Sequence, residues 1–155
     1  MDEFSPLPDN DPVQDVIRAA FDADLDISGG WGYTPDTPLV LHALPPSESL
    51  PQTQHMLASM RTYLEMHLTR PKKERYGSIN LNEIERHTEE RNGKHVECVH
   101  YKVEAMKEHD YETFIEEYKE GYGRPDFDLN DHFQRRKQAT FQRTIVMCFE
   151  IMVKE

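Results

Sequence analysis

The chain has 155 residues, of which 37% are hydrophobic and 30% are charged, and its formal net charge is −11 at pH 7. The length suits one domain and the seven Phe, seven Tyr and one Trp argue against intrinsic disorder, while the acidity disfavours binding to a phosphate backbone. The sequence lacks an apolar run of about 18 residues that would predict a membrane span, and no secretory signal is recognisable. Two cysteines are too few for a disulfide framework. We therefore expect a cytoplasmic protein without membrane or nucleic-acid partners.

Residues 1–11 are rich in Pro and Asp and are predicted to be disordered, which leaves 12–155 as a single α+β domain. A helix is predicted to begin this domain, with Asp11 as its N-cap and Pro12 at its first position. Its apolar residues recur at helical spacing and should form one core-facing stripe: Val13, Val16, Ile17, Ala20 and Phe21.

Two short strands are predicted next, over 24–27 and 38–44, and the second is apolar enough to lie inside a sheet. The Gly-rich segment 29–36 between them is expected to form the irregular tip of a β-hairpin. A long helix then runs from about Thr53 to about Leu68 and ends before Pro71, because the residue that precedes a proline is disfavoured in the α conformation.

The strongest local signal is Asn92-Gly93, which predicts a two-residue turn between strands over 79–91 and 94–106. The first strand is highly charged and should lie at a sheet edge, although a helix over this segment is an alternative, since Glu and Arg are good helix formers. Helices over 110–121 and 131–138 follow, and the apolar stretch 140–153 predicts a buried central strand. This order predicts an α+β fold, with a mostly antiparallel sheet of four to five strands and two to four helices packed on it.

The acidic residues are concentrated near the N-terminus. Residues 1–50 contain ten acidic residues and one basic residue, a net charge of −9, whereas residues 51–155 contain 19 acidic and 17 basic residues, a net charge of −2. Because opposite potentials accelerate encounter, this asymmetry favours a basic protein partner. Solubility alone is an alternative explanation of an acidic surface.

The Gly-rich segment places two aromatic residues beside this acidic region. Aromatic side chains supply large contact areas at interfaces, although a hairpin tip with its Trp folded onto the core fits the same sequence. The predicted partner-binding residues are Asp22, Asp24, Asp26, Trp31, Tyr33 and Asp36.

A metal site is predicted on the second hairpin. If Asn92-Gly93 is a two-residue turn, His87 faces Cys98 and Glu85 faces His100, and alternation places all four side chains on one face of the sheet. Imidazole, thiolate and carboxylate groups are the ligands that zinc accepts. The prediction depends on the register, because a slip of one residue would move the cluster apart; polar cross-strand pairing without metal is the alternative.

The sequence therefore predicts a small acidic interaction module, an adaptor or an inhibitor, that docks a basic partner through its acidic N-terminal third and the loop 29–33. Its size and charge resemble those of small acidic nuclease inhibitors such as immunity proteins, in composition only and without a shared motif. The alternative is a small metal-binding or hydrolytic enzyme centred on the 85–100 hairpin. A homodimer is a further hypothesis. No catalytic residue and no cofactor are predicted, and whether the chain is an enzyme is left open.

Overall fold

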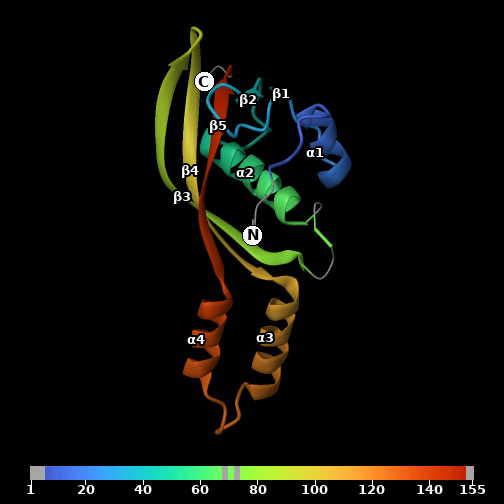
Figure 1. Ribbon diagram of the computed structural model, residues 1–155, viewed down its shortest axis with the longest axis vertical. Helices are drawn as coiled ribbons and strands as arrows, with labels where there is room; N and C mark the ends of the chain where they lie inside the picture. Colours follow the sequence, from blue (N-terminus) through green and yellow to red (C-terminus); the bar gives the residue numbers. More distant parts are fainter. Residues whose placement is uncertain (1–5, 68–69, 72–73, 153–155) are drawn as a thin grey trace.

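The computed structural model describes residues 6–67, 70–71 and 74–152 (Figure 1). In chain order its elements are α1 (Val13–Phe21), β1 (Ile27–Gly29), β2 (Leu39–Leu41), α2 (Leu50–His67), β3 (Tyr76–Arg91), β4 (Lys94–Lys107), α3 (Glu108–Gly121), α4 (Leu129–Ala139) and β5 (Phe141–Ile151). The described residues thus form four helices and a five-stranded, mostly antiparallel sheet, which confirms the predicted α+β fold. Three parts of the predictions lie outside the described residues: residues 1–5 of the predicted disordered segment, residue 68 of the predicted long helix and residue 153 of the predicted last strand. None of the helices in these ranges has the length and apolar character needed to cross a bilayer.

The strands lie in the order β1-β2-β5-β4-β3, and β2–β5 is the parallel pair among those described. The position of β5 in the middle of the sheet confirms the central strand predicted from its apolar sequence, and its Met147 and Phe149 are completely buried. The charged strand β3 lies at the edge, also as predicted. Here exposed charges discourage pairing with other chains.

The β3–β4 hairpin has the predicted register: His87 pairs with Cys98, and Arg91 pairs with Lys94. Asn92 and Gly93 adopt φ values of 54° and 77°, and positive φ at both turn residues is what a type I′ turn requires. A helix over 79–91 is therefore excluded.

Several predicted boundaries were wrong, and local contacts explain the shifts. The predicted strand 24–27 begins only at Ile27, because α1 competes for the preceding backbone: the Gln14 amide donates to the Leu25 carbonyl at 2.6 Å. Helix α2 begins at Leu50 rather than Thr53. There Ser49 and Gln52 form a reciprocal capping box, in which each backbone N–H donates to the side chain of the other.

The main hydrophobic core lies between the sheet and helices α1 and α2 (Figure 1). Leu57 and Leu64 of α2 are completely buried, as are Val99 and Val103 of β4. Leu7, within the segment 1–11, also packs against this core. The N-terminal segment is therefore held at least at this residue.

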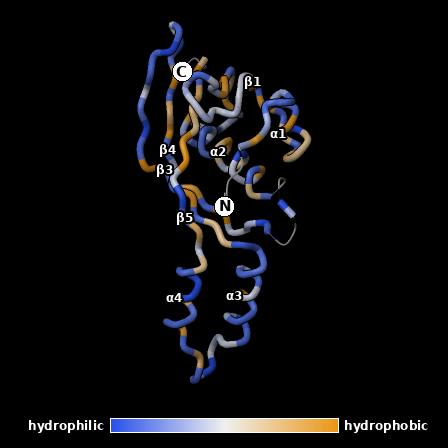
Figure 2. The backbone as a smooth tube through the Cα atoms, in the orientation of Figure 1, coloured by the Kyte–Doolittle hydropathy of each residue, from blue (hydrophilic) through white to orange (hydrophobic). Residues whose placement is uncertain are grey.

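Helices α3 and α4 form an antiparallel pair, the α3–α4 hairpin, that projects beyond the end of the sheet (Figure 1). Hydrophilic residues predominate along both helices (Figure 2). The rings of Phe114, Tyr118 and Phe127 surround the completely buried His132. This hairpin consequently has a small aromatic core of its own.

Candidate functional site

The acidic residues predicted to bind a partner are in part neutralised by arginines of the same chain. Asp22, Asp24 and Asp26 are exposed in the segment that follows α1, and the Asp24 carboxylate accepts from the Arg18 guanidinium at 2.7 Å. Asp36 lies on the loop between β1 and β2, 3.3 Å from the Arg91 guanidinium. Two of these four aspartates are therefore already paired within the chain.

Trp31 does not present its indole to a partner, because the residue is only 4% exposed. The neighbouring Gly32 explains this burial: its carbonyl accepts from the Cys148 N–H at 2.7 Å, and a Cβ on Gly32 would lie 2.5 Å from the Cys148 carbonyl oxygen. The glycine thus lets the loop lie directly against β5. The accessible Trp31 expected from the sequence is corrected to a core residue.

Tyr33 is half-buried and is held by hydrogen bonds. Its hydroxyl donates to Glu65 Oε2 at 2.5 Å and accepts from the Leu7 N–H at 2.9 Å, and the Arg61 guanidinium lies 4.3 Å from its ring centroid. Burial, followed by the nearby negative charge of Glu65, raises the pKa of Tyr33. The loop therefore uses Tyr33 as an anchor to α2, and its Gly-rich sequence serves packing.

The anchor depends on buried charges that the sequence reasoning did not identify. Arg61 of α2 is 1% exposed and donates to the backbone carbonyls of Trp31 and Val146, at 3.2 and 2.8 Å. Burial lowers the pKa of Arg61 and raises that of Glu65, while the opposite charge of each partner counteracts the shift. The available signal was the spacing of four between Arg61 and Glu65, which places both on one helix face.

An open hollow lies beside α1. It has a volume of about 490 Å³ and is lined by Asp11, Asp15, Val16, Ala19, Ala20 and Tyr63. Its apolar residues lie next to two carboxylates, and Tyr63 of α2 is 38% exposed there. The hollow therefore combines apolar residues with two carboxylates.

The β3–β4 hairpin brings together three potential metal ligands: His87, Glu89 and Cys98. Glu89 Oε2 lies 3.4 Å from His87 Nε2 and 3.8 Å from Cys98 Sγ. His100 contacts the other nitrogen of His87, with 3.4 Å between its Nε2 and His87 Nδ1. Three of the four residues predicted as ligands, His87, Cys98 and His100, thus lie close together.

Glu85 does not belong to this three-residue group, and Glu89 takes the corresponding place. Both residues lie on the same face of β3, since strand side chains alternate. A register shift separates Glu83 from Glu85, and such irregularities increase the local twist of a strand. Glu89 faces the cluster, and its other oxygen lies 3.3 Å from the Arg91 guanidinium.

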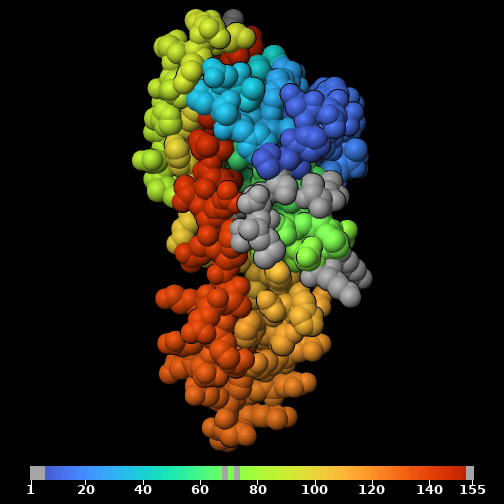
Figure 3. Space-filling model, in the orientation of Figure 1, coloured from blue at the N-terminus to red at the C-terminus, as the bar shows by residue number. Residues whose placement is uncertain are grey.

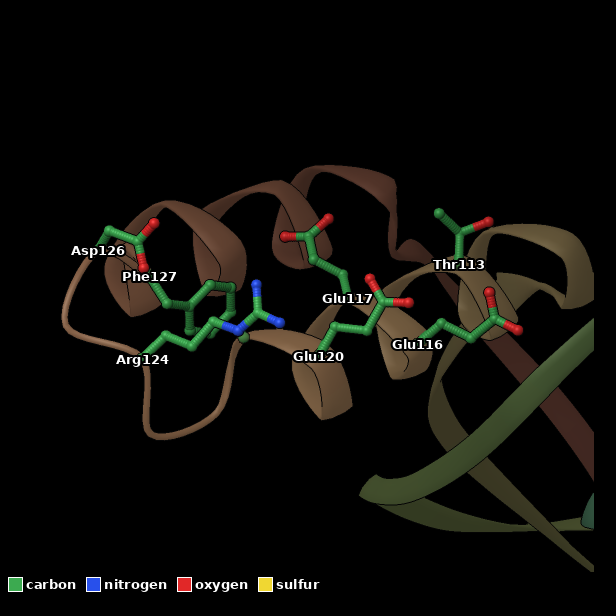
Figure 4. Close-up of a pocket in the computed structure, with 8 residues that line it drawn as sticks. Thr113, Glu116, Glu117, Glu120, Arg124, Asp126 and Phe127 are labelled. Atoms are coloured by element: carbon green, nitrogen blue, oxygen red, sulfur yellow. The ribbon is translucent and has the colours of Figure 1, made fainter.

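A second hollow, of about 450 Å³, lies on the α3–α4 hairpin. Figure 4 shows Glu116, Glu117 and Glu120 projecting from α3, opposite Arg124 and Phe127 of the connecting loop. Glu117 already accepts hydrogen bonds from Arg135 and lies 3.0 Å from His132 Nδ1. At least this carboxylate therefore stabilises the hairpin.

Comparisons with protein-family models, with curated proteins and with solved structures find no match to this chain. The function is therefore inferred from the residues and their geometry.

Proposed function

We propose that the protein is a cytoplasmic interaction module, an adaptor or inhibitor, that docks a basic segment of a partner protein on the acidic surface around α1. The observation that carries this proposal is the hollow beside α1, where Val16, Ala19, Ala20 and Tyr63 lie next to Asp11 and Asp15. The free, buried thiols of Cys98 and Cys148 are compatible with a reducing compartment.

A basic side chain matches this hollow in both of its parts. Lys and Arg bury their aliphatic stems on apolar surface while the charged head stays in water. Here the stem would lie on Ala19, Ala20 and Tyr63, and the head would reach Asp11 or Asp15. The exposed Asp22 and Asp26 extend the negative potential around the same helix.

The proposal differs from the sequence prediction in the residues that make contact. Trp31 and Tyr33 are excluded from the docking surface because one is buried and the other is held by Glu65. Asp24 and Asp36 contribute less, since Arg18 and Arg91 approach them to 2.7 and 3.3 Å, whereas Asp15 lies farther from Arg18, at 3.8 Å. The proposed docking surface therefore lies on α1 and not on the Gly-rich loop.

The test uses the double variant Asp11→Asn/Asp15→Asn and a partner isolated with the wild-type chain. We expect binding of that partner to weaken about tenfold, because losing two charges worth about 0.7 kcal/mol each amounts to that factor. The affinity of the wild type should also fall more steeply with salt than that of the variant. Titration calorimetry at two salt concentrations measures both effects.

The matched control is Glu112→Gln/Glu116→Gln, which removes two negative charges from the exposed side of α3. An equal loss of affinity in the control would show that the effect of Asp11→Asn/Asp15→Asn comes from the change in net charge alone. Binding that is insensitive to salt would refute docking on the acidic surface. Sedimentation at several concentrations, on the same samples, tests the homodimer hypothesis.

A further inference from the structure

The outer face of the β3–β4 hairpin carries a set of side chains that the proposed docking surface does not use. One ring nitrogen of His87, a carboxylate oxygen of Glu89 and Cys98 Sγ all lie within 4.8 Å of one another. They come from two paired strands, since His87 and Cys98 are cross-strand partners in the observed register. Backbone pairing therefore fixes the distance between the elements that supply these groups.

The two distances from Glu89 to the other ligands match a tetrahedral zinc site. With Zn–N and Zn–O bonds of about 2.1 Å and a Zn–S bond of about 2.3 Å, tetrahedral angles place N and O about 3.4 Å apart and S and O about 3.6 Å apart. The observed separations are 3.4 Å between His87 Nε2 and Glu89 Oε2, and 3.8 Å between Cys98 Sγ and Glu89 Oε2. An ion could thus contact all three groups after small side-chain movements.

We propose that His87 Nε2, the Glu89 carboxylate and the Cys98 thiolate bind one zinc-like divalent cation, with a fourth position open to solvent. His87 has a side chain that is 49% exposed, which gives the ion a route into the site. Cys98, 1% exposed, closes the opposite side. Hard cations such as Mg²⁺ or Ca²⁺ are disfavoured, because they prefer oxygen ligands.

Neighbouring residues position the ligands. When His87 Nδ1 donates its proton to His100 Nε2, 3.4 Å away, His87 Nε2 keeps the lone pair that a metal needs. Arg91 holds the second oxygen of Glu89 and is itself paired with Asp36, so its positive charge is compensated beside the site. These contacts account for His100 as a positioning residue rather than a ligand.

Charge balance also favours a divalent ion. On binding, the Cys98 sulfur forms the metal bond, and the thiol proton leaves to water. The ion then faces one thiolate and one carboxylate, so the complex of the cation with these two anions and a neutral imidazole carries no net charge. A neutral complex suits a site that lies half inside the sheet.

The experiment titrates Co²⁺, as a spectroscopic probe for zinc, into the full chain prepared without a histidine tag and kept reduced. We expect one equivalent per chain, the absorption bands of tetrahedral cobalt, and a thiolate-to-cobalt charge-transfer band that Zn²⁺ abolishes by displacement. His87→Ala and Glu89→Gln, which alter more exposed residues than Cys98, should each weaken binding at least tenfold. Cys98→Ser should remove the charge-transfer band, and His100→Ala should weaken binding while keeping it.

Three matched controls separate this site from adventitious binding. Glu85→Gln alters an acid on the same face of β3, His95→Ala another histidine of the hairpin, and Cys148→Ser the thiol that pairs with Cys98 across β4 and β5. Glu85→Gln and His95→Ala should change the affinity by no more than twofold, and Cys148→Ser, whose thiol contacts that of Cys98, should keep the charge-transfer band. Clearly substoichiometric binding, a missing charge-transfer band, or a band lost in Cys148→Ser but kept in Cys98→Ser would overturn the proposal.

Discussion

A single glycine illustrates how the loop between β1 and β2 is held. Gly32 and Gly93 have nearly the same backbone conformation, with φ of 78° and 77°. A Cβ at Gly93 would meet no heavy atom within 4 Å, whereas a Cβ at Gly32 would lie 2.5 Å from the Cys148 carbonyl oxygen. A substitution at Gly93 therefore measures the cost of a left-handed backbone alone, whereas a substitution at Gly32 adds the cost of a steric clash.

We predict that Gly93→Ala lowers the free energy of unfolding by about 1 kcal/mol, which is the penalty for a left-handed non-glycine residue. Gly32→Ala carries the same penalty and must also displace β5 or the loop, so its loss should be larger by about 1–3 kcal/mol. Urea denaturation monitored by the fluorescence of the buried Trp31 measures both variants. Equal losses would show that the loop is not seated against β5.

For single residues, the sequence alone could not distinguish between alternative positions of a side chain. Trp31 among glycines fits an exposed tip as well as a buried anchor, and the choice depends on the contact of Gly32 with Cys148, which is distant in sequence. Glu85 and Glu89 share one strand face, so alternation alone cannot tell which of them reaches Cys98. The buried pair of Arg61 and Glu65 was missed because charged residues are rarely buried.

Secondary structure elements were more predictable where a local signal fixes them. Asn92-Gly93 determined both the turn and the register of β3 and β4, and therefore most of the candidate metal cluster. The predicted strand over 24–27 was less accurate, because its start depends on a side chain of α1, the Gln14 amide that donates to the Leu25 carbonyl. The Asn92-Gly93 signal thus placed elements, whereas side-chain contacts such as Ser49–Gln52 at α2 and Gln14–Leu25 at β1 set element ends.

The α3–α4 hairpin is stabilised by a carboxylate on each of its helices. Arg135 of α4 hydrogen-bonds Glu117 of α3 and also Asp131, the latter at 2.9 Å, and His132 adds a contact with Glu117. Hydrogen bonds from Arg135 and then from His132 lower the pKa of Glu117 from its ordinary value of 4.5 to about 2. The ionised form of Glu117 is thus favoured in the folded hairpin.

A lowered folded-state pKa gives stability that is complete above the unfolded value and is lost as the pH falls. We therefore predict that the contribution of Glu117 is present above pH 4.5 and disappears towards pH 2. Glu117→Gln should destabilise α3 and α4 at pH 6, and its difference from wild type should shrink through that window. The pH dependence of the amide NMR signals of both helices measures this, with Glu112→Gln as the control; a difference that is constant with pH would contradict the prediction.

The molecule as a whole consists of two packed regions of unequal size. The described residues of the main core come from α1, α2, the sheet and the segments that connect them, and none of them lies between positions 108 and 139. In the space-filling view the α3–α4 hairpin forms the narrow end of the molecule (Figure 3). The hairpin can therefore open without exposing the main core.

We predict two levels of stability in native-state hydrogen exchange. Amides of α3 and α4 should exchange through a local opening of lower free energy than those of α2, β4 and β5, because local units with few buried apolar contacts open first. Gly121→Ala tests the assignment: its Cβ would collide with the Phe127 ring in the small aromatic core of the hairpin. This variant should accelerate exchange in α3 and α4 and leave β4 and β5 protected as in wild type. A uniform loss of protection along the chain would instead show that the hairpin and the sheet unfold as one cooperative unit.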